Sequence, residues 1–215
     1  MNIGVLGTGN VGRTLGTKLL SLGYRVMLGS RTADNETAAE WAKGAGDAAS
    51  HGTFAGAAEH GELLLNCVSG ARALDALAAA GAERMNGKVL IDVTNPLDFS
   101  KGFPPTLLVS NDTSLGEEIQ RAYPEVKVVK ALNTVSCDIM VDPGRLPGDH
   151  VVFTSGNHAS AKGEVAALLT SFGWKRIIDL GDITTARGTE SYLLLWVRMY
   201  QNFGTGHFNI AIAKA

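Results

Sequence analysis

The stretch MNIGVLGTGNVG, residues 1–12, decides the fold, because an apolar segment runs directly into a Gly-x-Gly-x-x-Gly motif. Apolar residues at helical spacing follow it: Val11, Leu15, Leu19, Leu20 and Leu22. A second apolar segment, residues 24–28, comes next. A strand, a glycine motif, a helix and a second strand in this order are typical of a βαβ unit that binds a dinucleotide.

Each glycine of the motif has its own expected role. Gly7 permits a tight turn, Gly9 lets the backbone approach a pyrophosphate, and Gly12 lets helix and strand pack closely. The pyrophosphate would accept hydrogen bonds from N–H groups at the helix N-terminus. The segment therefore supplies these candidate cofactor contacts: Gly7, Thr8, Gly9, Asn10, Val11 and Gly12.

The end of the second strand indicates which dinucleotide binds. NAD-binding proteins usually place an acidic residue there for the ribose 2′-hydroxyl. This chain has Ser30, Arg31 and Thr32, with no acid before Asp34. A hydroxyl and a guanidinium suit a 2′-phosphate, which a carboxylate would repel. The sequence therefore favours NADP(H), although an exposed arginine after a strand is the simpler alternative.

Composition narrows the class of protein. The 215 residues are 45% hydrophobic and carry a net charge of −2, which gives no electrostatic reason to expect nucleic acid or an anionic membrane as partner. No apolar run is long enough to cross a bilayer, and the chain starts in its first strand, so we expect no signal peptide and a cytoplasmic location. Cys67 and Cys137 are expected as reduced thiols, and the five histidines have no metal-ligand spacing.

The remaining pattern alternates strands and helices. Apolar runs of strand length occur at residues 62–68, 88–94 and 127–132, and a short strand is expected at 52–54. Helices are expected at 34–45, 55–60, 71–80 and 113–122. Ser69 is expected to cap the helix at 71–80, and residues 96–105 are expected to form a loop. This pattern predicts an α/β fold with a doubly wound, mainly parallel Rossmann sheet. Residues 1–145 would form the NADP-binding domain, and residues 146–215 a small C-terminal α/β extension that covers the cofactor cleft.

The C-terminal third predicts two further strands and two helical regions. The expected strands are 150–155 and 174–180, the expected helices are 158–172 and 184–201, and a short terminal strand is expected at 207–213.

Ligands of open α/β sheets bind beyond the carboxyl ends of the strands, which selects three more loops. We expect these three loops to surround the nicotinamide ring and its ribose. Their candidate cofactor residues are Val68, Ser69, Gly70, Asn95, Pro96, Asn133, Thr134 and Cys137. Asn95 and Asn133 can hydrogen-bond the carboxamide or ribose, and Pro96 can pack against the nicotinamide. Asn95-Pro96 is alternatively a simple turn, and Asn133-Thr134 a helix cap or turn.

The sequence shows no Ser–His–Asp or Tyr-x-x-x-Lys constellation, and no catalytic residue is assigned. Reduction of a carbonyl needs a group that moves a proton, whereas hydride transfer between two cofactor rings can rely on proximity and orientation. Hydride transfer between two rings would suit a cleft with an apolar wall that excludes water. The C-terminal helix could form such a wall with Leu193, Leu194, Trp196 and Met199. The same residues equally fit a helix of the hydrophobic core. Arg187 and Glu190 are expected to form a structural ion pair.

Several motifs in a fixed order resemble the F420-dependent NADP oxidoreductase family. They are Gly-Thr-Gly-Asn-Val-Gly, Leu-Gly-Ser-Arg-Thr, Asp92-Val-Thr-Asn-Pro, Val129-Lys-Ala-Leu-Asn-Thr-Val135 and Arg187-Gly-Thr-Glu190. The resemblance implies hydride exchange between NADPH C4 and C5 of the deazaflavin coenzyme F420, and a Rossmann domain with a small C-terminal domain, often in a homodimer. It places NADP contacts at Thr8 to Val11, Ser30, Arg31, Gly70, Pro96 and Cys137.

The chain also departs from the family pattern. Glu36 stands where a basic residue is frequent, Val68-Ser69 replaces a Val-Pro or Ile-Pro pair, and Asn133 replaces a histidine found in some members. The acceptor of the hydride is therefore open between F420 and a flavin. An NADPH-dependent reductase of a small imine or carbonyl, and a non-catalytic NADPH sensor, are the alternatives.

Overall fold

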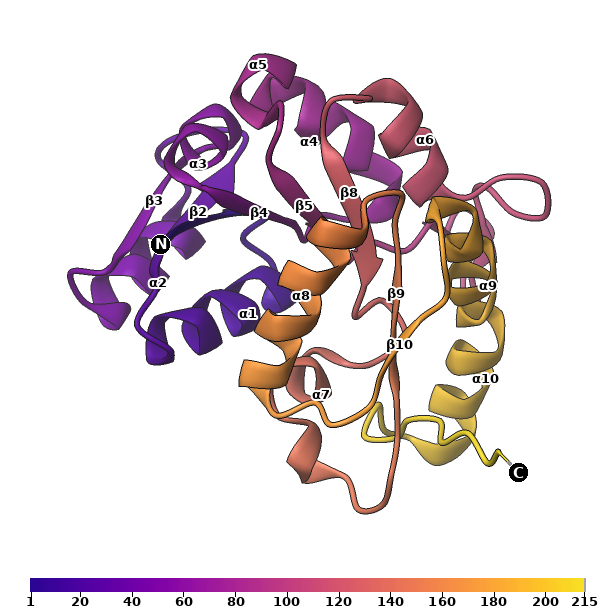
Figure 1. Cartoon of the computed structure of the whole chain (residues 1–215). Helices are drawn as coiled ribbons and strands as arrows, with labels where there is room; N and C mark the ends of the chain where they lie inside the picture. The colour runs from indigo at the N-terminus through magenta and orange to yellow at the C-terminus, as the bar shows by residue number, and fades with distance from the viewer. Residues whose placement is uncertain (215) are drawn as a thin grey trace.

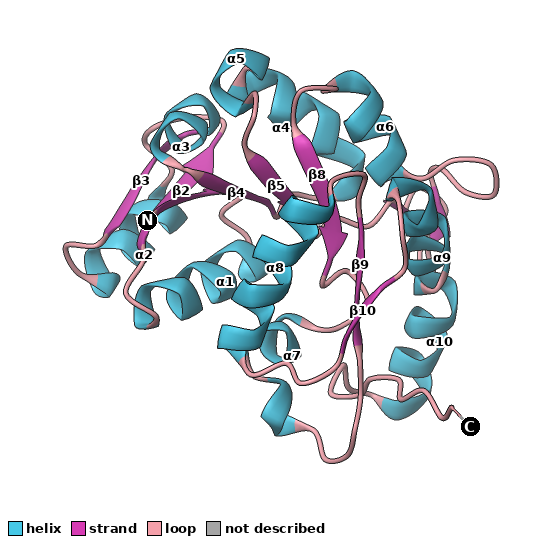
Figure 2. Ribbon diagram, viewed as in Figure 1, coloured by secondary structure: helices cyan, strands magenta, loops and turns pink. Residues whose placement is uncertain are grey.

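The computed structural model describes residues 1–214, and a single sheet of eight strands organises them (Figures 1 and 2). Its strand order is β10-β9-β8-β5-β4-β1-β2-β3. The strands are β1 Asn2–Leu6, β2 Arg25–Ser30, β3 Ala49–Thr53, β4 Leu63–Asn66, β5 Val89–Asp92, β8 Lys127–Ala131, β9 Val152–Ser155 and β10 Ile177–Asp179. All neighbours run parallel except β8 and β9, so the predicted doubly wound, mainly parallel α/β fold is confirmed.

Helices cover both faces of the sheet and bury it completely at its centre. The helices are α1 Asn10–Ser21, α2 Glu36–Ala45, α3 Phe54–His60, α4 Ala73–Ala80, α5 Ala82–Met85, α6 Leu115–Ala122, α7 Cys137–Val141, α8 Ala159–Phe172, α9 Ala186–Ser191 and α10 Leu193–Phe203. Helices α1, α2, α7 and α8 contribute to one apolar core, and α3 to α6 to the other. Along β4, Leu63 and Leu65 face the first core while Leu64 faces the second. A strand buried on both sides needs an uninterrupted apolar run, as observed.

Some expected boundaries differ from the structure. Strand β3 begins at Ala49 instead of residue 52. The predicted cap at Ser69 is wrong, because its side chain makes no capping hydrogen bond and a 3₁₀ turn, Gly70–Arg72, precedes α4. The loop predicted at 96–105 contains one strand of a small hairpin, in which β6 (Leu97–Asp98) pairs with β7 (Thr106–Leu107).

The C-terminal third continues the same sheet through β9 and β10. The strand expected at 207–213 is wrong, because this segment has no regular secondary structure. Single contacts attach it instead: Val151 N donates to Ile210 O at 3.1 Å, and Asn209 Nδ2 donates to Val151 O at 2.8 Å. Within residues 1–214, no helix combines the length and apolar character that crossing a bilayer requires.

Candidate dinucleotide site

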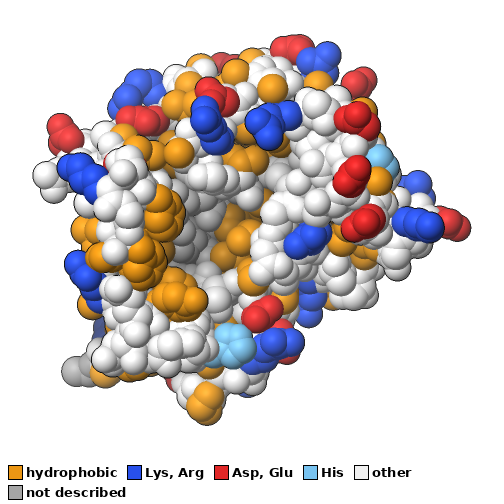
Figure 3. All heavy atoms as spheres, turned by 180° about the vertical axis from the view of Figure 1, so that it is seen from behind, with side chains coloured by type: hydrophobic (Ala, Val, Ile, Leu, Met, Phe, Trp, Pro, Cys, Tyr) orange, Lys and Arg blue, Asp and Glu red, His pale blue; other side chains and the backbone are white. Residues whose placement is uncertain are grey.

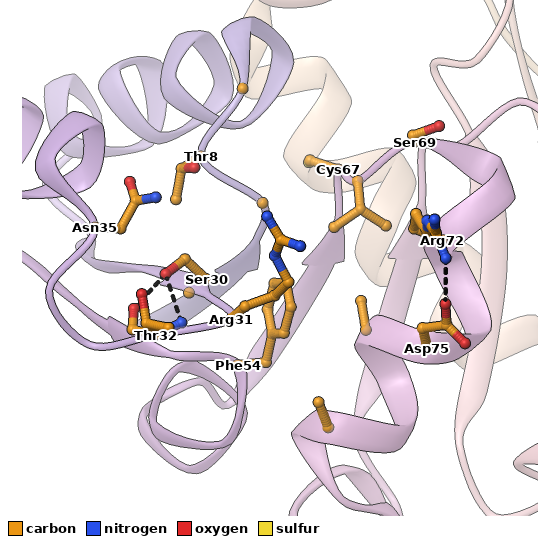
Figure 4. Close-up of a pocket in the computed structure, with 16 residues that line it drawn as sticks. Thr8, Ser30, Arg31, Thr32, Asn35, Phe54, Cys67, Ser69, Arg72 and Asp75 are labelled. Carbon is orange, nitrogen blue, oxygen red and sulfur yellow. Dashed lines mark hydrogen bonds and ion pairs between the residues drawn. The ribbon is translucent and has the colours of Figure 1, made fainter.

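A cavity of about 910 Å³ opens at the carboxyl ends of β1, β2 and β4 (Figure 4). It brings together these predicted cofactor residues: Gly7, Thr8, Gly9, Ser30, Arg31, Thr32, Val68 and Ser69. Phe54, Ala76 and Ala79 add an apolar part of the lining, and neither Phe54 nor the two alanines were expected at the site. The cavity therefore offers a glycine-rich end and an end with apolar walls.

The three motif glycines differ in what surrounds them. Gly7 has φ +124°, a conformation that favours glycine. A Cβ on Gly12 would lie 2.2 Å from Gly7 O, so this residue must be small for α1 to approach β1. A Cβ on Gly9 would meet nothing within 4 Å, and no side chain caps the N-terminus of α1. The open space before Gly9 and the uncapped N–H groups fit a pyrophosphate.

Arg31 is the cationic side chain of the cavity that has no carboxylate partner among residues 1–214. Its guanidinium reaches into the space between β2 and α4 (Figure 4). Across the cavity Arg72 is paired with Asp75 at 3.3 Å. The Ser30 hydroxyl contacts the Thr32 carbonyl and accepts from Thr32 N at 3.3 Å. A free guanidinium beside a hydroxyl suits a phosphate monoester.

The loops that follow β4, β5 and β8 meet beyond this cavity. A Cβ on Gly70 would lie 2.0 Å from Asn95 O, so the first two loops touch through backbone. Asn95 Nδ2 donates to Asn133 O at 2.8 Å, and Asn133 Nδ2 donates to Asn95 Oδ1 at 2.9 Å and to Thr189 O at 3.0 Å. Both donors of the Asn133 amide are thus used inside the protein, which leaves its Oδ1 for any further hydrogen bond. Pro96 is buried in the same place.

The remaining predicted residues lie around the loop after β8. Leu132 has φ +64°, an unusual backbone conformation directly before Asn133, of the kind that clusters at functional sites. Thr134 is buried, and Cys137 is half-buried with its Sγ 3.6 Å from Asn10 Nδ2. This contact links the loop to the start of α1, which Val11 continues as a partly buried residue.

A buried charge network under these loops was not predicted. Lys130, 1% exposed, places its Nζ 2.7 Å from Asp92 Oδ2 and 2.8 Å from Glu190 Oε1. Burial lowers the pKa of Lys130, but the two carboxylates outweigh this effect and the pKa is raised. A lysine inside the apolar run Lys127–Ala131 was the signal for such a network. Among residues 1–214, no three His, Cys, Asp or Glu side chains gather as metal ligands.

The expected ion pair between Arg187 and Glu190 is wrong. Arg187 Nε donates to Glu117 Oε2 at 2.8 Å, and Glu190 faces Lys130. The hydrogen bonds from Arg187, more than the opposing effect of burial, lower the pKa of Glu117. Both residues nevertheless have structural contacts, because they join α9 to the body of the sheet.

Helix α10 presents apolar residues of both kinds, buried and exposed. Leu193 is buried, Trp196 and Met199 are half-buried, and Leu194 is exposed. The face seen in Figure 3 is hollowed, with hydrophobic side chains gathered on the rim that α9 and α10 form. Three buried polar atoms nearby have no hydrogen-bond partner within the described residues 1–214: Ser136 Oγ, Tyr192 OH and Trp196 Nε1.

The sheet topology, the glycine turn before the uncapped helix α1 and the unpaired Arg31 after β2 occur together. This combination defines a Rossmann-type dinucleotide-binding protein. The family model "NADP oxidoreductase coenzyme F420-dependent" matches residues 2–96. A crystal structure of a candidate F420-dependent NADP-reductase from Arthrobacter sp. FB24 is 50% identical, with complete coverage of both chains and a TM-score of 0.95. The chain belongs to the family of F420-dependent NADP oxidoreductases and is an NADP-dependent oxidoreductase.

Two more distant relatives are matched over only part of their own length. The F420-dependent NADP reductase of Methanocaldococcus jannaschii is 31% identical over 128 residues, which are 58% of this chain and 57% of that protein. Metalloreductase STEAP3 of Rattus norvegicus is 26% identical over 189 residues, 88% of this chain. The chain spans only about a third (36%) of the metalloreductase and just over half (57%) of the archaeal reductase.

Proposed function

We propose that the chain transfers hydride between NADPH and coenzyme F420 or a flavin-type acceptor. The proposal rests mainly on the charge network: Asp92, Lys130 and Glu190 reach the loops after β5 and β8 but are paired with one another. They are therefore poorly placed to move a proton to a carbonyl or imine substrate. Transfer between two rings requires no such group, only proximity and orientation.

The proposed cofactor contacts are the residues predicted from the sequence. Gly7 to Gly12 would hold the pyrophosphate, and Ser30, Arg31 and Thr32 the 2′-phosphate. Val68 and Ser69 were expected at the nicotinamide, but they line the same cavity as Arg31 and would lie beside the adenosine. Gly70, Asn95, Pro96, Asn133, Thr134 and Cys137 would surround the nicotinamide ribose and ring. When bound, NADPH would supply a hydride from C4. A deazaflavin acceptor would take the hydride at C5 and a proton from solvent at a ring nitrogen.

The acceptor would lie on the side of α9 and α10, so that residues 146–215 form an extension covering the cleft. Trp196 and Met199, the half-buried residues of α10, would exclude water from the ring face, which favours ring-to-ring transfer. The partnerless atoms Ser136 Oγ, Tyr192 OH and Trp196 Nε1 support this placement, because buried polar atoms normally have partners and an acceptor with carbonyl groups could supply them.

Stopped-flow oxidation of NADPH deuterated at C4 tests the proposal. Coenzyme F420, FMN, a cyclic imine and no acceptor form the four arms. Turnover with F420 that leaves deuterium on C5 of its ring, or turnover with FMN that is slowed by the deuterium at C4 of NADPH, supports it. Turnover with the imine alone would make the chain an imine reductase, and tight NADPH binding without turnover in any arm would make it a sensor.

We also propose that the chain forms a homodimer through α10. Leu194, Leu195, Tyr200 and Phe203 are 43–57% exposed on this helix, a larger apolar surface than isolated exposed residues provide. Sedimentation of the wild-type chain and of Leu195→Glu tests it: a dimer that becomes a monomer is expected, and a wild-type monomer would refute it.

A further inference from the structure

The ammonium group of Lys130 has three oxygen partners, one for each of its protons. Besides Asp92 and Glu190, it donates to Thr94 O at 2.6 Å. Asp92 belongs to β5, Thr94 to the loop after it, and Glu190 to α9. One buried cation thus joins three separate parts of the chain, directly below the loop that carries Asn95.

The network holds two carboxylates and one lysine, and other groups compensate the second negative charge. The backbone N–H groups of Leu115 and Gly116, at the N-terminus of α6, donate to Glu190 at 2.8 and 3.0 Å. A helix N-terminus stabilises a negative charge there. Helices α6 and α9 lie next to each other (Figure 1), so Glu190 is bound from two sides.

A second set of contacts runs parallel to the first. Asn133 Nδ2 binds Asn95 Oδ1 and Thr189 O, and these two partners are the sequence neighbours of Thr94 and Glu190. The loop at 94–96 and the C-terminal end of α9 are therefore linked twice, once through Lys130 and once through the Asn133 amide.

Such a network contributes little to net stability. Burying an ion pair costs desolvation that its attraction hardly repays, and apolar side chains of similar volume are often at least as stabilising. What the network does provide is a fixed distance between the two segments, since each oxygen around Lys130 lies within 2.8 Å. Hydride transfer depends on that kind of distance.

We propose that Lys130 and Glu190 are positioning residues for hydride transfer, which set the spacing between the nicotinamide loop at 94–96 and the acceptor helices. This inference rests on the proposed function. Both side chains are buried, at 1% and 2% exposure, so neither would touch a cofactor bound in the cleft. They act through Thr94 and through the attachment of α9.

Glu190→Gln tests the proposal, because it leaves Lys130 paired with Asp92 and keeps an oxygen for the α6 N-terminus. We expect the NADPH dissociation constant to stay within about twofold. The single-turnover rate should fall between about tenfold and about a hundredfold, as for a small misplacement of reacting groups. The fluorescence lifetime of bound NADPH should shorten towards that of free NADPH, because the nicotinamide is held less firmly.

Glu117→Gln is the matched control. It removes the charge from the neighbouring contact between α6 and α9, at Arg187, which does not involve the 94–96 loop. It should leave both rate and lifetime unchanged. Glu190→Asp, which keeps the charge but shortens the side chain, should be more stable than Glu190→Gln and still shorten the lifetime.

The lifetime separates this proposal from the proposed function, because it needs no acceptor. If the wild-type chain turns over no acceptor, the proposed function fails while the lifetime comparison still applies. Wild-type lifetimes in both Glu190 variants, or equal losses in Glu117→Gln, would overturn the positioning role. Should Glu190→Gln not fold, Glu190→Asp gives the same comparison.

Discussion

Asn95 and Asn133 hold each other through two hydrogen bonds, at 2.8 Å from Asn95 Nδ2 to the Asn133 carbonyl and at 2.9 Å from Asn133 Nδ2 to Asn95 Oδ1. The pair joins the loops after β5 and β8, which are neighbouring strands of the sheet. Because Asn133 also binds Thr189 O, the same side chain reaches helix α9.

Asn133→Ala should lower the free energy of unfolding by about 2–3 kcal/mol, because Asn95 Oδ1 and Thr189 O then lose their donor in a buried place. Urea denaturation followed by circular dichroism measures the loss. Asn202→Ala, at an exposed position of α10, is the control and should stay within about 0.5 kcal/mol. A loss no larger than that of the control would mean that the amide contacts do not stabilise the loops.

Arg31→Ala should weaken NADPH binding by about 1.5–3 kcal/mol and leave NADH binding nearly unchanged, because an unpaired guanidinium is replaced where the 2′-phosphate is expected. Isothermal titration with both cofactors measures the difference. Arg72→Ala is the matched control, since Arg72 lines the same cavity but is already paired with Asp75. Equal losses for NADPH and NADH in Arg31→Ala would contradict the phosphate assignment.

Gly9→Ala and Gly12→Ala should separate binding from stability. A methyl group on Gly9 meets no protein atom within 4 Å, so stability should change by no more than about 0.5 kcal/mol while NADPH binding weakens about tenfold or more. A methyl group on Gly12 meets Gly7 O at 2.2 Å and should destabilise the protein by about 1–3 kcal/mol. Thermal melts and cofactor titrations of both variants provide the comparison. Unchanged affinity in Gly9→Ala would place the pyrophosphate elsewhere.

The contact between Glu117 and Arg187 should make stability depend on pH in the acid range. Hydrogen bonds from Arg187 lower the pKa of Glu117 in the folded chain, against the opposing effect of burial. The stabilisation is therefore present above the ordinary glutamate pKa of about 4.3 and is lost as the pH falls through the lowered value. Glu117→Gln should lose less stability than the wild type between about pH 5 and about pH 3. Urea denaturation at several pH values measures the free energy of unfolding of both proteins. An equal loss in the two proteins over this pH range would refute the linkage.

Local patterns predicted much of the sheet. The apolar runs at 62–68 and 88–94 contain β4 and β5. Both faces of these strands are buried, which requires a continuous apolar run, so the pattern predicted them directly. The prediction of a terminal strand at 207–213 was wrong, because the alternation of apolar and polar residues does not show whether a sheet edge is free to pair. The segment contacts Val151 only through isolated hydrogen bonds.

The contacts between distant segments could not be predicted in the same way. Glu190 was expected beside Arg187, its neighbour on one helix, whereas its partner Lys130 lies 60 positions earlier and meets it only after the chain has added β9, α8 and β10. Spacing along a helix determines which residues share a face, but the partner across an interface depends on the packing of whole elements. The geometry of the glycine motif was easier to predict because it is local: Gly7 has φ +124°, and Gly12 packs against Gly7 O, as expected.

Strands β9 and β10 run antiparallel to the rest of the sheet and bring α9 back to it. Glu190 of α9 therefore contacts Lys130 of β8, which also binds Asp92 of β5. A chain cut at residue 145 would leave Lys130 and Asp92 without Glu190, and would uncover the N-terminus of α6. The segment up to residue 145 therefore cannot reproduce the packing of the whole chain, because α9 supplies both one partner of Lys130 and the carboxylate that covers the N-terminus of α6.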